Sequence, residues 1–187
     1  MKKTAATTSK KGRGLIRSLN RSLVRDDKSP AVVRKTRPFR EPTICPGCGS
    51  AFLHKTWRRD HKLSHEMLAR SQWRLCPACG QVGRQEGQGR VLIRGTAVAE
   101  SRETIQRRID NVTQRAMNTQ PQRRLVSVAP LDGEALEVLT TSQKLAHRIV
   151  HELKKAFGGH ASYSWNDDGM LFATWDYDRP KSRAKRA

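Results

Sequence analysis

The four cysteines of the sequence occur as two copies of one short motif, Cys45-Pro-Gly-Cys48-Gly and Cys76-Pro-Ala-Cys79-Gly. In C-P-x-C-G, the turn between the cysteines directs both thiolates at one metal ion, and the glycine lets backbone N–H groups approach the sulfurs. The two motifs are 27 residues apart and leave no cysteine unpaired. We therefore predict one structural Zn²⁺, bound by Cys45, Cys48, Cys76 and Cys79.

Other interpretations of the cysteines stay open. The first motif also begins a C-x2-C-x12-H-x3-H pattern ending at His61 and His65, the spacing of a zinc finger that reads the DNA major groove. Against it, Arg58 stands where such a finger packs a leucine, and the second motif would be left without partners. A pair of disulfides and a pair of redox-active dithiols are two further alternatives.

The composition indicates that only part of the chain forms a core. Of its 187 residues, 36% are hydrophobic, below the usual ~45–50%. No apolar run approaches the ~18–20 residues that span a bilayer, so we expect no integral membrane protein. The first residues, MKKTAATTSKKGRG, lack the apolar stretch of a secretory signal, and we expect a cytoplasmic protein.

The positive charge of the chain is unevenly distributed. There are 37 Lys and Arg against 17 Asp and Glu, a formal net charge of +20. Residues 1–44 carry +10, residues 45–95 carry +6, and residues 123–178 carry −2. Neutralising phosphates with Lys and Arg releases condensed counterions, so this segregation favours nucleic-acid binding. Solvated tails that bind nothing are the simpler alternative.

The N-terminal region contains one amphipathic stretch within a segment expected to be disordered. Leu15, Leu19 and Leu23 recur every fourth residue, each followed two positions later by an arginine. This pattern predicts a short basic helix that folds on RNA. An anionic lipid surface and organellar targeting are the alternatives.

The candidate nucleic-acid contacts lie in both tails and between the cysteine motifs, where an indole among cations suits base stacking beside phosphates. They are Lys10, Lys11, Arg13, Arg17, Arg21, Arg25, Arg34, Lys35, Arg37, Arg40, Lys55, Trp57, Arg58, Arg59, Lys62, Arg70, Arg74, Lys181, Arg183, Lys185 and Arg186. The alternative for Trp57, and for Trp73, is packing within the small cysteine region.

The rest of the chain predicts a helix and a small α+β domain. An apolar stripe indicates an amphipathic helix within residues 100–118. Strands are predicted at 124–128, 135–141, 161–165 and 170–176, with a helix at 142–157 between the two pairs. We expect a four-stranded antiparallel sheet, with Trp165, Trp175, Phe157 and Phe172 in its core.

The fold class expected overall is α+β: a four-cysteine zinc ribbon, a linking helix and a ββαββ domain, with disordered basic tails. The boundaries are 1–43 and 179–187 for the tails, 44–95 for the ribbon, 96–122 for the helix and 123–178 for the domain. No P-loop, H-E-x-x-H or G-x-S-x-G motif is present, so we expect a non-enzyme without a small-molecule substrate. His147 and His151, one helical turn apart, are expected to be a solvated or partly packed pair.

Several motifs resemble a little-characterised family of small bacterial zinc-ribbon proteins. They are the runs CPGCGSAF and LCPACG, then VLIRGTAVAESRETI and TTSQKLAHRIVHELKKAFGG, which together fall within residues 44–176. That family is in turn similar to the N-terminal part of the eukaryotic and archaeal adaptor for large-ribosomal-subunit export. The adaptor has more cysteine pairs than this chain, which has ligands for one zinc.

The resemblance implies a ribosome- or rRNA-directed partner, with the four cysteines as zinc ligands. We therefore expect a zinc-dependent RNA-binding protein associated with the large subunit of the ribosome, acting in assembly, storage or stress. Ribosomal proteins are further possible partners. A DNA-binding regulator and a protein-interaction module with polyanion-binding tails are the alternatives.

Overall fold

The computed structural model describes residues 38–131 and 135–178. The amphipathic helix expected at residues 15–25, the C-terminal tail and most of the N-terminal tail lie outside this range. None of the described helices is long and apolar enough to cross a membrane. We call residues 38–88 the cysteine module and the described residues of 89–178 the sheet module.

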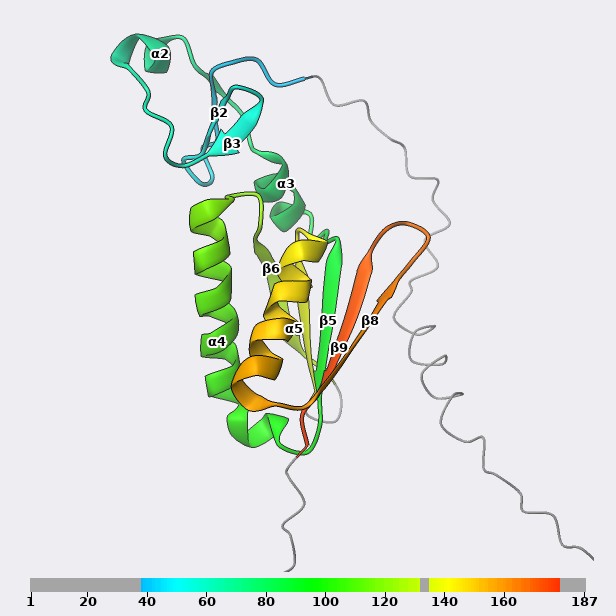
Figure 1. Cartoon of the computed structure of the whole chain (residues 1–187). Helices are drawn as coiled ribbons and strands as arrows, with labels where there is room; N and C mark the ends of the chain where they lie inside the picture. Colours follow the sequence, from blue (N-terminus) through cyan, green and yellow to red (C-terminus); the bar gives the residue numbers. More distant parts are fainter. Residues whose placement is uncertain (1–37, 132–134, 179–187) are drawn as a thin grey trace, which may run out of the picture. The chain divides into compact units, whose positions relative to one another are not determined.

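The cysteine module combines a small sheet with two short helices (Figure 1). Its elements are β1 (Thr43–Ile44), β2 (Ala51–Leu53), β3 (Thr56–Arg58), α2 (His65–Ala69), β4 (Gln72–Trp73) and α3 (Pro77–Gly83). The strands are ordered β3-β2-β1-β4. β2 pairs antiparallel with both β1 and β3, and β4 runs parallel to β1.

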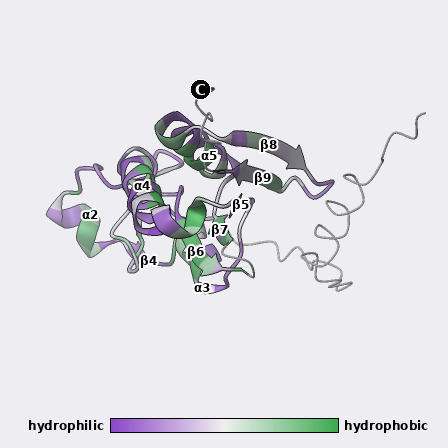
Figure 2. Ribbon diagram, turned by 90° about the horizontal axis from the view of Figure 1, so that it is seen from below, coloured by the Kyte–Doolittle hydropathy of each residue, from purple (hydrophilic) through white to green (hydrophobic). Residues whose placement is uncertain are grey.

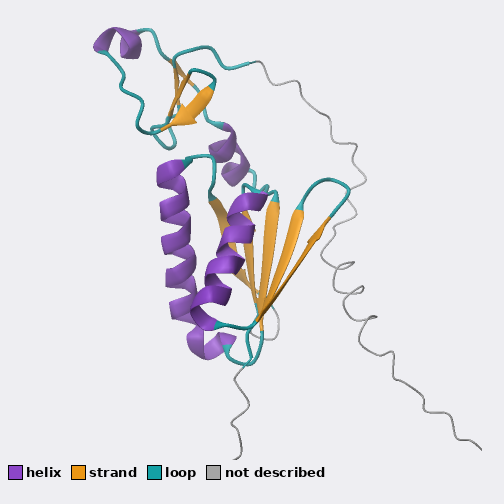
Figure 3. Ribbon diagram, viewed as in Figure 1, coloured by secondary structure: helices purple, strands orange, loops and turns teal. Residues whose placement is uncertain are grey.

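The sheet module is a five-stranded mixed sheet with two helices (Figure 3). Its elements are β5 (Gly89–Arg94), α4 (Val98–Thr119), β6 (Leu125–Pro130), β7 (Leu136–Thr140), α5 (Gln143–Phe157), β8 (His160–Trp165) and β9 (Leu171–Asp176). The strand order is β6-β7-β5-β9-β8, with β5 parallel to β9 and antiparallel to β7.

Both long helices pack on the same face of this sheet (Figures 1 and 2). Their amphipathic patterns explain this, since Ile105 and Ile109 of α4 and Leu145 and Ile149 of α5 are completely buried in one core. The Ser142 side chain caps the start of α5 by accepting a hydrogen bond from the Leu145 N–H group, as expected of an N-cap serine. The helix predicted from the stripe in residues 100–118 is α4.

The predicted four-stranded antiparallel sheet is wrong in strand number and in orientation: residues 89–94, which we assigned to the ribbon, form a fifth, central strand that runs parallel to β9. Within β5, Val91 and Ile93 are completely buried, and the strand pairs with β7 on one side and β9 on the other. A short apolar strand next to the cysteine region gives no sign in the sequence of which sheet it joins, because its partners lie about 50 and 80 residues away.

The aromatic residues assigned to the core separate into two groups. Trp175 is completely buried, and Phe157 packs against the same core. In contrast, Trp165 is 61% exposed at the end of the edge strand β8. Phe172 alternates with the buried residues of β9 and therefore lies on the sheet face opposite α4 and α5. The prediction for these two residues is wrong because, among the described residues, helices cover only one face of the sheet.

Candidate metal centre

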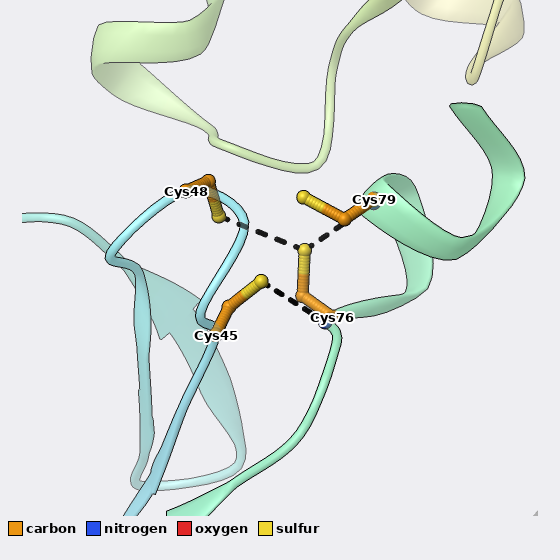
Figure 4. A group of neighbouring side chains, drawn as sticks. All are labelled: Cys45, Cys48, Cys76 and Cys79. Atoms are coloured by element: carbon orange, nitrogen blue, oxygen red, sulfur yellow. Dashed lines mark hydrogen bonds between the residues drawn. The ribbon is translucent and has the colours of Figure 1, made fainter. Parts of the chain in front are cut away.

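The four cysteine sulfurs converge on one point (Figure 4). All four Sγ atoms lie within 4.8 Å of one another, and the Sγ atoms of Cys48 and Cys76 are 3.8 Å apart. Tetrahedral coordination with Zn–S bonds of about 2.3 Å places the sulfurs about 3.8 Å apart. All four cysteines are free thiols, so neither disulfide pair is formed. The cluster can hold one metal ion, and a set of four thiolates suits zinc.

Local backbone geometry places the first pair of cysteines. Cys45 follows β1, and the Cys45 carbonyl accepts a hydrogen bond from the Gly49 N–H group at 2.9 Å. Gly49 has φ +70°, a conformation that glycine adopts without steric cost. A Cβ on Gly47 would lie 3.2 Å from the Cys79 Sγ atom, so glycine lets the turn approach the opposite pair of sulfurs.

The second pair of cysteines lies at the start of α3. Cys76 is the N-cap residue, Pro77 occupies the first turn, and the Cys79 N–H group donates to the Cys76 Sγ atom at 3.4 Å. The Cys76 N–H group also donates to the Cys45 Sγ atom at 3.3 Å. The second C-P-x-C-G motif therefore begins a helix, whereas the first forms a turn between two strands.

The surroundings shift the pKa values of the thiols in opposite directions. Burial and the nearby Cys76 thiolate raise the pKa of Cys79, and burial also raises the pKa of Cys76. For Cys48, burial opposes ionisation, but hydrogen bonds with Ser50 and Cys45 and the positive charge of Arg124 together outweigh it and lower its pKa to about 7. Four thiols this close cannot all ionise without a cation, and a bound Zn²⁺ would supply the compensating charge.

Two side chains of the sheet module contact the cysteine cluster. The Arg124 guanidinium donates through Nη1 to the Cys79 Sγ atom at 3.3 Å and through Nε to the Pro121 carbonyl at 3.0 Å. The Gln122 side-chain oxygen accepts from the Ala78 N–H group at 3.2 Å. Sequence reasoning missed both residues, since an arginine 45 positions after a cysteine carries no spacing signal.

The histidines of the alternative zinc finger are not part of the cluster. The His61 Nε2 atom lies 3.4 Å from the Thr56 carbonyl oxygen, and neither His61 nor His65 belongs to the group of converging ligands. In the part of the chain that the structure describes, His147 and His151 also belong to no such group. Instead, His147 stacks on Tyr163 with ring centroids 4.8 Å apart.

Only some of the predicted nucleic-acid contacts lie within the described residues. Those of residues 1–37 and 181–186 lie outside the described range. The cations within it are all exposed: Arg40, Lys55, Arg58, Arg59, Lys62, Arg70 and Arg74.

The two tryptophans of the cysteine module differ in exposure. Trp57 is half-buried, with its ring centroid 5.1 Å from that of Phe39 and 5.3 Å from that of Phe52, and it packs against the cysteine cluster. Trp73 is 65% exposed. Our alternative for both indoles is packing within the module, and this is correct for Trp57 only.

No protein-family model, curated protein or solved structure matches this chain.

Proposed function

We propose that this chain is a non-enzymatic RNA-binding protein with one structural Zn²⁺, and that it associates with the ribosome through large-subunit rRNA. The observation that carries the proposal is the exposed positive charge of the cysteine module. Seven predicted cations of the described chain are exposed, whereas residues 123–178 have a net charge of −2.

Most of these cations are available to phosphates. Arg58 forms an ion pair with Asp60 at 3.9 Å, but both side chains are more than half exposed, and such pairs are weak in water. Glu41, a further acidic residue of the module, accepts hydrogen bonds from the N–H groups of His54 and Lys55 instead. Phosphates can therefore replace the few acidic partners at little cost.

The exposed Trp73 supports single-stranded RNA as the ligand. Three of the four large hydrophobic side chains exposed in the described chain, Leu68, Trp73 and Leu75, lie within eight residues of the sequence. A nucleobase stacked on an indole covers such surface whatever its identity, while neighbouring cations contact the phosphates. Trp73 takes the base-stacking role that we predicted for Trp57.

The ribosomal partner rests on the resemblance of the two cysteine motifs and α5 to the bacterial zinc-ribbon family. A DNA-binding regulator is less supported, because it needs His61 and His65 as zinc ligands. A protein-interaction module stays an alternative, since Leu68, Trp73 and Leu75 would also suit a protein partner.

The test is sedimentation of the tagged full chain from cells on a sucrose gradient, followed by crosslinking and sequencing of the bound nucleic acid. We expect cosedimentation with the large subunit and crosslinks in one rRNA region. The double variant Arg58→Gln/Arg59→Gln should shift protein toward the top of the gradient. A matched control, Arg102→Gln/Arg115→Gln, removes the same charge from exposed positions of α4 and should sediment like wild type.

Three outcomes would contradict the proposal. Crosslinks to DNA would favour the regulator. Recovery of protein partners without RNA, unchanged after removal of residues 1–43, would favour the interaction module. An equal shift of both double variants toward the top of the gradient would show that net charge, and not the cysteine module, determines binding.

A further inference from the structure

A cleft of about 240 Å³ lies between α3, α4 and β6. Its polar lining consists of Asp110, Thr113, Gln114 and Arg124. Its apolar lining consists of Val82, Met117 and Leu125. Arg124 is the residue whose guanidinium contacts the Cys79 sulfur, so the cleft adjoins the metal centre.

Thr113 is the first sign that this cleft holds a ligand. The residue is only 6% exposed, and its buried Oγ1 atom has no hydrogen-bond partner in the described chain. A buried hydroxyl without a partner destabilises a fold, and natural structures contain few of them. A ligand atom in the cleft would supply the missing partner.

The second sign is a pair of oppositely charged side chains that form no ion pair with each other. Asp110 and Arg124 line the same cleft, yet no ion pair joins them within the described residues. Hydrogen bonds to Pro121 and Cys79 hold the Arg124 side chain. Asp110 and Gln114 are one helical turn apart on α4, so they lie on the same face of the helix. The cleft thus offers a carboxylate, an amide and a guanidinium to one ligand.

We propose that this cleft binds a guanine base. Guanine presents two neighbouring N–H donors, at N1 and at the exocyclic N2 amine, which match the two oxygens of the Asp110 carboxylate. Its O6 atom accepts hydrogen bonds, for which the Gln114 amide and the Arg124 guanidinium are donors. The apolar side chains contact the faces of the ring. Neither adenine nor uracil offers two adjacent donors to a carboxylate.

The base can come from RNA or from a free nucleotide, because both present the same edge. In the first case the inference rests on the proposed function, since proteins read unstacked RNA bases by their hydrogen-bonding edges. The two sources are separated by comparing an oligonucleotide with GMP.

The experiment measures binding of the full, zinc-loaded chain to a labelled oligouridine with one central guanosine, or with inosine at the same position. Inosine lacks only the N2 amine. We expect guanosine to bind roughly tenfold more tightly, in line with a bidentate contact. Asp110→Asn should abolish this preference, while Asp167→Asn, an equal change of charge in the β8–β9 turn, should retain it. Binding of GMP at least as tight as that of the oligonucleotide identifies a nucleotide site, and much weaker binding of GMP identifies RNA as the source.

Thr113→Val provides a second, independent readout. Valine has nearly the same shape but no hydroxyl, so the free protein should melt at the same or a higher temperature while guanosine binding weakens. Equal binding of guanosine and inosine by the wild type overturns the inference and leaves the proposed function standing. If neither oligonucleotide binds, the proposed function fails. Calorimetry with GMP and with IMP then tests the cleft separately, and binding of neither nucleotide overturns the inference.

Discussion

Each of the four sulfurs is positioned by a few neighbouring residues. The Cys45 and Cys76 sulfurs accept backbone N–H groups, and Ser50 bonds to the Cys48 sulfur at 3.2 Å. Buried residues around the cluster are few: Cys45, Cys76 and Ala78, with Cys48, Trp57 and Cys79 partly buried against them. So small a core cannot hold four thiols together by itself, and a metal ion in the cluster would do so.

The first prediction separates the two sets of possible zinc ligands. Cys76→Ser removes a sulfur from the cluster and should abolish stoichiometric zinc binding. The double variant His61→Ala/His65→Ala should retain one zinc per chain, because neither imidazole is among the converging ligands. Metal analysis of the two purified variants after dialysis checks this. If the histidine variant loses its zinc and Cys76→Ser keeps it, the result favours the zinc finger that ends at His61 and His65.

The second prediction concerns Arg124, a positioning residue for the metal centre. Four thiolates around Zn²⁺ carry excess negative charge, and the guanidinium hydrogen-bonded to Cys79 offsets part of it. Arg124→Met should lower zinc affinity by roughly 10–100-fold, with Arg124→Lys intermediate. Competition with a chromogenic chelator measures the affinity. Arg123→Met, the matched control, should behave as wild type, and equal zinc loss from both variants would show a general effect of charge.

The cysteines could be predicted from the sequence because a metal site needs its ligands at fixed local spacings. Arg124 and Trp73 could not. What distinguishes Arg124 from Arg123 is its contact with a sulfur 45 positions earlier, and what distinguishes Trp73 from Trp57 is the absence of an aromatic neighbour among the described residues. Both depend on how distant segments pack, which residue types alone do not specify.

Among the elements, the β2–β3 hairpin has an unusual turn. His54 and Lys55 both have positive φ, 49° and 60°, the conformation of a two-residue turn that favours Asn-Gly. Glu41 accepts hydrogen bonds from the Lys55 and His54 N–H groups, and these contacts lower its pKa. A lowered pKa means that this stabilisation is present at neutral pH and is lost as the pH falls below about 4.5.

The third prediction follows from that turn. His54→Asn/Lys55→Gly keeps the backbone N–H groups that Glu41 accepts and relieves the positive φ angles, so it should stabilise the zinc-loaded protein by about 1 kcal/mol. Urea unfolding measures the difference. Lys62→Gly, at an exposed position outside helix and strand, is the control and should give no gain. A loss of stability in the double variant would show that the side chains contribute more than the turn costs.

The fourth prediction tests β5 as the central strand. A fragment of residues 89–178 contains the whole main core and should fold cooperatively. The fragment 123–178, our predicted domain, lacks β5, the strand between β7 and β9. It should stay unfolded, because β7 and β9 each lose one partner strand along their full length. Amide dispersion in NMR spectra and thermal melting distinguish the two. Cooperative folding of residues 123–178 would show that its four strands suffice.

The described chain as a whole combines two modules with different sources of stability. The sheet module has 17 completely or nearly completely buried hydrophobic residues in one cluster, including Trp175 and the facing stripes of α4 and α5. The mixed α+β character of this module could be predicted because its amphipathic patterns are local, but the inclusion of β5 and α4 in its core could not. The cysteine module has a much smaller hydrophobic core, in which Ile44, Ala51 and Leu53 are buried besides the cysteine cluster. Its exposed cations repel one another.

This difference leads to the last prediction, on metal removal. With a strong chelator, residues 38–88 should lose their structure while residues 89–178 stay folded, because binding of a structural zinc supplies the folding free energy of such small modules, on the order of 10 kcal/mol. Limited proteolysis should then cut at Lys55, Arg58 or Arg59 and spare the bonds within α5. Loss of the Arg124–Cys79 and Gln122–Ala78 contacts should affect the start of β6, visible as faster amide exchange there. Re-addition of zinc should restore protection, and cleavage throughout both modules would show that the metal supports the entire described chain.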